Sequence, residues 1–296
     1  NGESITISAD SEPDLFWGMR GAGSNLAVVT EVEIGLQPLS WVYGGGLFFP
    51  GESAGDVLDA LVETVRDVPD ALSLSVAFIR FPPNPALPVP LQGRSICHVR
   101  VCHVGSALEA EPHLNTLRRC APLLLDTVAD LPIDRIGTVH GDPVVPAPVN
   151  CRSQVLSKFD ADVAALLVSV LDDQPPYLIE LRHLGGALAL DPTPGNAVGH
   201  RDGVVNLFTS TYPRTPSGSG GPSQDDLIQA LSPYSNGGAM VNFLQGSHVT
   251  EADVRRAYDR DSWPRLTALK TTWDPENRLR STKNIAAYPS TDAGAG

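Results

Sequence analysis

The sequence predicts a mixed α+β fold, because segments with strand periodicity are interleaved with segments with helix periodicity. Residues 72–81 alternate large apolar residues with small ones, which is the period-two pattern of a strand with one buried face. Residues 53–66 instead place valines and leucines on one face at helical spacing. The hydrophobic fraction of 42% and the charged fraction of 19% over 296 residues are typical of a globular chain with room for one large core or two smaller ones.

Composition and charge exclude several functional classes. The net charge of -13 disfavours a nucleic-acid partner, since no cluster of Lys and Arg is present to displace counterions from a phosphate backbone. No apolar run approaches the roughly 20 residues that a membrane helix needs, so we expect no membrane association. The four cysteines are too few and too scattered for a disulfide framework, which favours a reducing, cytoplasmic location.

The first informative stretch runs from Asp14 to Glu31, and we interpret it as a glycine loop between an aromatic-anchored turn and a strand. Gly21 and Gly23 allow positive φ and a close approach of the backbone to a ligand, and Asn25 offers amide groups beside them. The alternation at 28–34 predicts a half-buried strand after the loop. From the residues alone, a tight turn that only reverses the chain explains this stretch equally well.

The remaining elements follow from the same periodicities and from turn residues. Residues 3–7 begin the chain as an alternating strand, and 130–149 form a long loop rich in Pro and Gly. We expect flexible segments at 215–221 and at 290–296. The predicted strands are 41–49, 72–81, 95–104 and 204–212, and the predicted helices are 53–66, 106–119, 160–171, 223–231 and a helix that begins at Ser262.

Residues 95–104 read SICHVRVCHV and contain two Cys-His pairs, which raises the possibility of a zinc-dependent hydrolase. Strand geometry argues against it, because Cys97 and His103 face one way while His98 and Cys102 face the other. We therefore expect core packing here and no metal site.

The second informative stretch is PYLIELRHLGGALAL, at 176–190. Its alternation places Glu180 and Arg182 together on the face opposite the apolar residues. An exposed ion pair on a solvated face explains this pattern, and so does a polar face directed at a ligand.

Three groups of residues together resemble a known family. The first is the string PDLFW, Arg20-Gly21, Asn25 and VVTE. The second covers 177–201 with Gly185-Gly186, and the third covers 239–285, with WDP and Asn284-Ile285 toward its end. These groups resemble the berberine bridge enzyme-like FAD-linked oxidases of the vanillyl-alcohol oxidase, or p-cresol methylhydroxylase, superfamily. Ala22, Leu26 and Ala27 stand where that family has Gly, Phe and Gly, and Met240 stands where it has a tyrosine.

The resemblance implies an antiparallel sheet with helices on one face, flanked by N- and C-terminal pieces of a flavin-binding domain. In these terms, 1–37 is the end of the FAD-binding domain, 38–238 is the substrate-binding α+β domain and 239–296 returns to the flavin domain. The chain would begin inside a domain, so most of the flavin domain would be missing, and this missing N-terminal flavin-domain polypeptide would be the partner of the chain.

The implied activity is transfer of hydride from an alcohol, sugar or amine C–H bond to flavin N5, with FAD as the cofactor and a small molecule as the substrate. Glu180 is then the expected base, and Arg182 or Asn242 orients the substrate or stabilises a developing oxyanion. An alternative is a non-catalytic module that binds small molecules, or one half of a split flavoenzyme. The residues expected to bind the cofactor are Arg20, Gly21, Gly23, Asn25, Val28 and Asn284.

Overall fold

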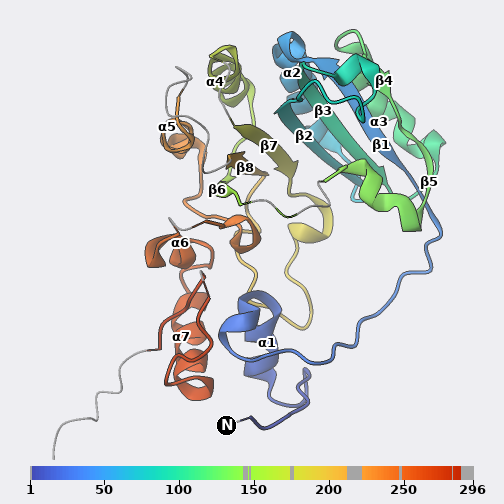
Figure 1. Cartoon of the computed structure of the whole chain (residues 1–296). Helices are drawn as coiled ribbons and strands as arrows, with labels where there is room; N and C mark the ends of the chain where they lie inside the picture. Colours follow the sequence, from blue (N-terminus) through green and yellow to red (C-terminus); the bar gives the residue numbers. More distant parts are fainter. Residues whose placement is uncertain are drawn as a thin grey trace, which may run out of the picture.

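The computed structural model describes residues 2–142, 146, 148–173, 177–211, 222–246, 249–281 and 283–287. Within this part of the chain the fold has two bodies, a large sheet covered by helices and a smaller helical body below it (Figure 1). The expected flexible segments at 215–221 and 290–296, and part of the 130–149 loop, lie outside the described residues.

An eight-stranded sheet forms the larger body, and its described strand pairs are all antiparallel. The strand order is β4-β1-β3-β2-β7-β8-β6, and β5 pairs with β1 beside β4. The strands are β1 (Trp41–Pro50), β2 (Leu72–Arg80), β3 (Ser95–His103), β4 (Leu125–Asp126), β5 (Ala129–Pro132), β6 (Asn150–Leu156), β7 (Leu178–His183) and β8 (Val205–Thr211).

Helices cover one face of this sheet, and the main hydrophobic core lies between the two layers. In β2, Leu74 and Val76 enter this core, and Val99 of β3 and Leu181 of β7 lie on the same side because alternate residues of a strand share a face. The predicted fold class, an antiparallel sheet with helices on one face, is confirmed. The covering helices are α2 (Ala54–Thr64), α3 (Ala107–Arg119), α4 (Ala161–Asp172) and α5 (Gln224–Ala230).

The smaller body joins the two ends of the described chain around a second hydrophobic core. Leu15 and Leu26 come from the N-terminal part, and Leu266 and Ile285 come from the C-terminal part. Figure 1 shows these segments together below the sheet. The helices of this body are α1 (Pro13–Ala22), α6 (Glu251–Arg256) and α7 (Ser262–Trp273).

A buried lysine fastens the two ends of this smaller body to each other. Lys270 of α7 is fully buried, and its Nζ donates to Asn25 O at 2.9 Å, to Asp274 Oδ2 at 2.5 Å and to Leu279 O at 3.1 Å. The Asn25 side chain adds a second tie, since its Oδ1 accepts from Ile285 N at 2.8 Å. A buried ammonium is tolerated only when its donors are satisfied, and these partners satisfy them.

Two predicted strands and one predicted turn differ from the structure. The segment 28–34 is extended but forms no strand, and the same holds for the described residues of 3–7. A strand is defined by a paired neighbour, and neither segment has one within the described part of the chain. The expected aromatic-anchored turn is instead the helix α1, which kinks at Arg20 and Gly21.

Helix lengths bear on membrane insertion. Among the helices of the described residues, none combines the length and the apolar character that crossing a bilayer requires.

Candidate functional site

The face of the sheet that turns away from α2, α3 and α4 carries two rows of side chains, which we call the polar face. The register pairs Arg100 of β3 with Ser75 of β2, Ser75 with Arg182 of β7, and Arg182 with Asn206 of β8. The neighbouring row on the same face, two residues along each strand, runs His98, Ala77, Glu180, Phe208. Small residues on β2 leave room for the arginines on either side to reach toward the centre.

Glu180 lies at the centre of the polar face and is 3% exposed. Its Oε1 accepts from Arg100 Nη1 at 2.6 Å, and its Oε2 accepts from Arg182 Nη2 at 3.1 Å. Arg182 Nε also lies 2.9 Å from Oε1, though outside hydrogen-bond geometry. The structure therefore brings the two predicted residues together and adds Arg100, which is 5% exposed, as a second cation.

A histidine completes this cluster from outside the sheet. His140 follows a short 3₁₀ segment, and its Nδ1 lies 3.9 Å from Glu180 Oε1 with a third of the side chain exposed. Burial, and then the positive charges of Arg100 and Arg182, lower the pKa of His140 below its ordinary value. The imidazole is therefore neutral at pH 7.

Aromatic rings border the cluster. His98 stacks on Phe48 with ring centroids 4.1 Å apart, and burial together with the charge of Arg100 lowers the pKa of His98 to about 3. On the other side, the Arg182 guanidinium lies 4.7 Å from the Phe243 ring centroid, and Phe243 contacts Phe208 at 5.1 Å. The polar face thus offers a charged centre between two aromatic walls.

The segment that contains Asn242 is held against the outer edge of β6. Cys151 N donates to Gln245 O at 3.1 Å, and Met240 N donates to Ser153 Oγ at 3.3 Å. Val241–Phe243 form a 3₁₀ turn, in which Phe243 reaches Arg182 while Asn242 is exposed beside it. Asn242 therefore lies on the turn beside the cluster, but it forms no hydrogen bond with Glu180 or Arg182.

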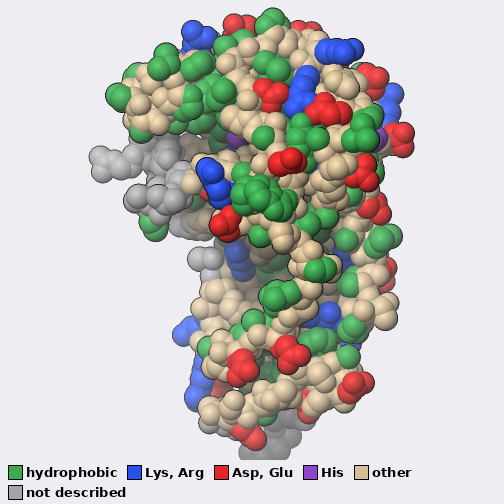
Figure 2. All heavy atoms as spheres, turned by 90° about the vertical axis from the view of Figure 1, so that its right-hand side faces the viewer, with side chains coloured by type: hydrophobic (Ala, Val, Ile, Leu, Met, Phe, Trp, Pro, Cys, Tyr) green, Lys and Arg blue, Asp and Glu red, His purple; other side chains and the backbone are tan. Residues whose placement is uncertain are grey.

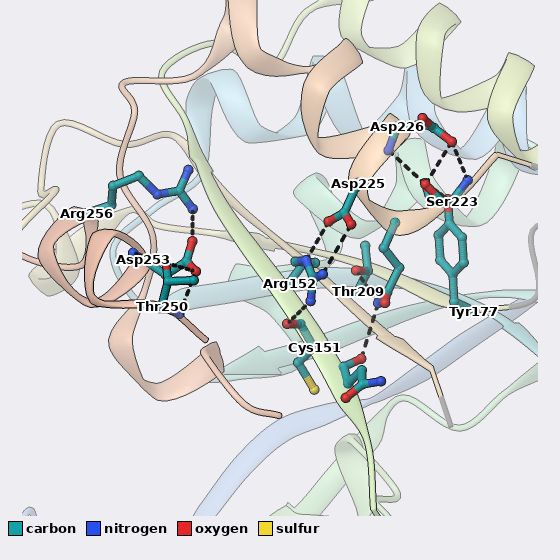
Figure 3. A network of polar contacts seen from close by, with 12 residues as sticks. Cys151, Arg152, Tyr177, Thr209, Ser223, Asp225, Asp226, Thr250, Asp253 and Arg256 are labelled. Atoms are coloured by element: carbon teal, nitrogen blue, oxygen red, sulfur yellow. Dashed lines mark hydrogen bonds and ion pairs between the residues drawn. The ribbon is translucent and has the colours of Figure 1, made fainter. Parts of the chain in front are cut away.

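A separate group of polar contacts lies around β6, α5 and the start of α6 (Figure 3). Arg152 Nε donates to Asp225 Oδ1 of α5 at 2.7 Å. At the start of α6, Thr250 N donates to Asp253 Oδ2 at 2.9 Å and Asp253 N donates to Thr250 Oγ1 at 3.2 Å, which is a capping box. Arg152 pairs with Thr209, and Thr209 with the core residue Ile179, so Arg152 lies on the helix-covered face of the sheet, away from the cluster.

Of three residues expected to bind the cofactor, Arg20 and Gly21 have other partners in the fold, while Gly23 is free of close neighbours at its Cβ position. Arg20 Nη2 donates to Pro194 O at 3.1 Å and to Gly195 O, and its guanidinium lies 4.2 Å from the ring centroid of Phe16. Gly21 is required by a close approach to the chain itself, because a Cβ there would lie 2.7 Å from the Ala197 carbonyl carbon. Gly23 has the expected positive φ of 39°, and nothing lies within 4 Å of the position that its Cβ would take.

The other expected cofactor residues meet where the two ends of the chain join. Asn25 is buried and serves as the tie to Ile285 described above. Asn284 lies next to this tie, and its buried Oδ1 has no hydrogen-bond partner among the described residues. Val28 lines an open recess of about 440 Å³ with Ser24, Ala27, Val29, Arg278, Leu279, Arg280 and Ser281.

The recess and the polar face belong to different bodies of the molecule. In Figure 2 the molecule is hollowed between the two bodies, and Lys and Arg side chains appear in the hollow. The predicted Cys-His segment divides between two environments, since Cys97 enters the main core and His98 lies on the polar face. No group of His, Cys, Asp and Glu side chains within the described ranges is arranged to hold a metal ion.

The sequence interpretation missed Arg100, His140, Asn206 and Phe243. The alternation at 95–104 already places Arg100 on the same side as His98, but only the strand order β3-β2-β7 shows that this side faces Glu180. His140 lies in a turn, where no periodicity predicts the direction of a side chain.

Comparisons with known proteins identify relatives over nearly the whole chain, although no family model matches it. It is 26% identical over 307 residues to (R)-6-hydroxynicotine oxidase of Paenarthrobacter nicotinovorans, covering 96% of this chain and 63% of that protein. It is also 26% identical over 291 residues to the FAD-linked oxidoreductase aurO of Gibberella zeae, covering 95% of this chain and 54% of that protein. The chain thus spans little more than half to just under two thirds of these relatives.

Solved structures share its fold. The crystal structure of 6-hydroxy-D-nicotine oxidase from Arthrobacter nicotinovorans superposes with a TM-score of 0.75 at 23% identity, covering 96% of this chain and 63% of that one. Xylooligosaccharide oxidase from Myceliophthora thermophila gives a TM-score of 0.75 at 17% identity, covering 98% and 64%. A berberine bridge enzyme-like protein from Physcomitrella patens gives 0.71 at 15% identity, covering 95% and 62%.

Proposed function

We propose that this chain, a homologue of FAD-linked oxidoreductases with the fold of the berberine bridge enzyme-like oxidases, is the substrate-binding part of such an enzyme. The observation that carries the proposal is the cluster of Glu180 with Arg100 and Arg182 on the polar face, bordered by aromatic rings. Residues 38–238 would bind the substrate, while 1–37 and 239–296 would belong with the FAD-binding part.

The residues around the recess fit FAD in part. The recess is smaller than a whole dinucleotide needs, yet its arginines suit an anionic group, and the unsatisfied Asn284 Oδ1 beside Asn25 suits a donor such as an imide N–H. Arg20, Gly21 and Asn25 are committed to contacts within the chain. We therefore propose that FAD contacts Val28, Asn284, Arg278 and Arg280. We also propose that a flavin-domain polypeptide supplies most of the site, since this chain covers only part of the length of its relatives.

Bound FAD would supply the acceptor for a hydride from an alcohol, sugar or amine C–H bond. The chain's own residues would bind the substrate, orient it and take up its proton. We propose that Glu180 accepts this proton, since an alcohol needs a base within about 3 Å to lose it at neutral pH. Arg182 would orient the substrate through its partly exposed guanidinium, and Asn242 would offer an exposed amide on the turn that carries Phe243.

The flavin assignment is tested by colour. The isolated chain is expected to hold FAD weakly, whereas a protein extended at the N-terminus is expected to be yellow, with absorbance near about 450 nm. An extended protein that stays colourless after reconstitution with FAD would refute the assignment.

The proton acceptor is tested in the extended protein with Glu180→Gln. Turnover should fall by about 10²-fold or more while the flavin content stays unchanged, because the amide cannot accept the proton. Asp225→Asn, which alters an exposed ion pair with Arg152, is the matched control and should turn over normally. Unchanged turnover in Glu180→Gln would remove this residue from the reaction.

A second candidate function is binding without redox chemistry, as a small-molecule module or as one half of a split flavoenzyme. It is favoured by the commitment of Arg20, Gly21 and Asn25 to contacts within the fold, which leaves few groups for a dinucleotide. Flavin reduction by substrates in the extended protein would exclude the module, and recovery of activity on mixing two separate polypeptides would support the split enzyme.

A further inference from the structure

The charges of the cluster do not balance. Arg100 and Arg182 bring two guanidinium charges to one carboxylate, that of Glu180, and the neighbouring His140 is neutral at pH 7. Asp142, which also acts on His140, is exposed to solvent. A cation that is mostly removed from water is costly unless a counter-charge accompanies it. This positive excess is notable in a chain whose net charge is -13.

Hydrogen-bond donors are in excess at the same place. Arg100 is 5% exposed, and its Nε has no partner among the described residues. Asn206, fully buried in the same row, uses its Oδ1 to accept from Ser153 Oγ at 2.8 Å, while its Nδ2 has no described partner. Buried donors normally have acceptors, so their pairing with a bound group is the simplest account.

The surroundings limit the shape of that group. Phe243 and Phe208 form one wall, and the stacked Phe48 and His98 form the other. Arg182 and His140 are each about one third exposed, which leaves the cluster accessible along this side. A planar group between aromatic walls, facing guanidinium donors, matches the geometry in which carboxylates bind arginine.

We propose that the ligand of the polar face carries a carboxylate on or near a planar ring, so that the substrate of the proposed oxidoreductase is an alcohol or amine that is also a carboxylic acid. The carboxylate compensates the second guanidinium and accepts hydrogen bonds from donors that Glu180 alone does not satisfy. The identification of this ligand as the substrate rests on the proposed function, whereas the binding of a carboxylate does not depend on flavin.

Binding of benzoate to the full chain, measured by titration calorimetry without flavin, tests the proposal. Benzamide has nearly the same shape without the charge, and inorganic phosphate has the charge without the ring. Benzoate should bind at least about tenfold more tightly than either probe. Arg182→Gln should weaken benzoate binding by about tenfold or more, whereas Arg152→Gln, on β6 and paired with the exposed Asp225, should leave it unchanged.

Glu180→Gln provides an independent check that remains available if Arg182→Gln fails to fold. Removing the competing carboxylate should tighten benzoate binding. Absent benzoate binding, equal binding of benzamide or tighter binding of phosphate would each overturn the proposal. An Arg182→Gln protein that folds and binds like the wild type would do the same. A yellow extended protein without benzoate binding would leave the flavin assignment standing and remove only the substrate class.

Discussion

Replacing Lys270 by methionine should strongly destabilise the smaller body. The side chain is fully buried, and its ammonium joins Asn25, Asp274 and Leu279, so the change removes three hydrogen bonds at once. Removing one partner of a buried ion pair costs about 3–5 kcal/mol, because the other charge is left uncompensated. Asp274 keeps two backbone donors, Leu279 N at 2.8 Å and Arg278 N at 2.8 Å. Because these donors partly compensate its charge, we expect a loss of about 3 kcal/mol, at the lower end of that range.

Urea unfolding followed by tryptophan fluorescence measures this loss. Trp263 is buried in the second core, and Trp17 packs against it, so the emission reports mainly on the smaller body. Lys158→Met, on an exposed lysine, is the control and should change stability by less than about 0.5 kcal/mol. The double variant Lys270→Met/Asp274→Leu should recover part of the loss, since it removes the stranded charge as well.

Acid should weaken the same contact. Burial alone would favour the neutral acid, but Lys270 and the backbone N–H groups of Leu279 and Arg278 outweigh it and hold the pKa of Asp274 below its ordinary value of 3.8. A carboxyl whose pKa is depressed on folding stabilises the protein above its unfolded pKa and loses that contribution as the pH falls through the folded pKa. Below about pH 4 the wild type should therefore lose stability faster than the double variant. A Lys270→Met protein as stable as the wild type at pH 7 would refute this reasoning. Identical losses of stability with falling pH in the wild type and the double variant would refute it as well.

Two further changes test local contacts. Gly21→Ala should cost about 1–3 kcal/mol, because its Cβ would lie 2.8 Å from the Ala197 Cβ, while Gly35→Ala, with nothing within 4 Å, should be nearly neutral in the same urea assay. Thr250→Ala should cost about 1 kcal/mol of stability through the loss of the α6 cap. Thr250→Ser keeps the hydroxyl and should retain most of that stability. Equal stability of the two variants would show that the capping box contributes nothing.

The sequence predicted those parts of the fold whose signal is local. The strands at 41–49, 72–81 and 95–104 agree with β1, β2 and β3 to within one residue, because each alternates between a core face and another face. The pattern at 28–34 is equally regular, but a strand also needs a neighbour, and the described part of the chain offers none. Periodicity therefore predicts the burial pattern of a segment better than its pairing.

The glycines of α1 misled the sequence interpretation for a physical reason. A Cβ on Gly18 would lie 2.8 Å from a methyl carbon of Leu269 and 2.9 Å from one of Leu26. The glycine lets α1 approach α7 closely, so a residue that disfavours helices locally is required by tertiary packing. No single segment carries that information.

The candidate site was predictable only along one strand. Alternation places Glu180 and Arg182 on one face, and the structure confirms that they are in contact. Arg100 lies about 80 residues earlier and reaches Glu180 only because β2 separates their strands with the small residues Ser75 and Ala77. That arrangement depends on strand order, which the alternation of one segment does not determine.

The extended segment between the two bodies also affects how this protein behaves at high concentration. Val28, Val32, Ile34 and Leu36 are each more than two thirds exposed, on a backbone whose amide groups find no strand partner among the described residues (Figure 1). Such a ribbon is a template for intermolecular sheet formation. Turbidity and light scattering should therefore rise with protein concentration, and a single lysine in place of Ile34 should suppress this self-association without disturbing either hydrophobic core.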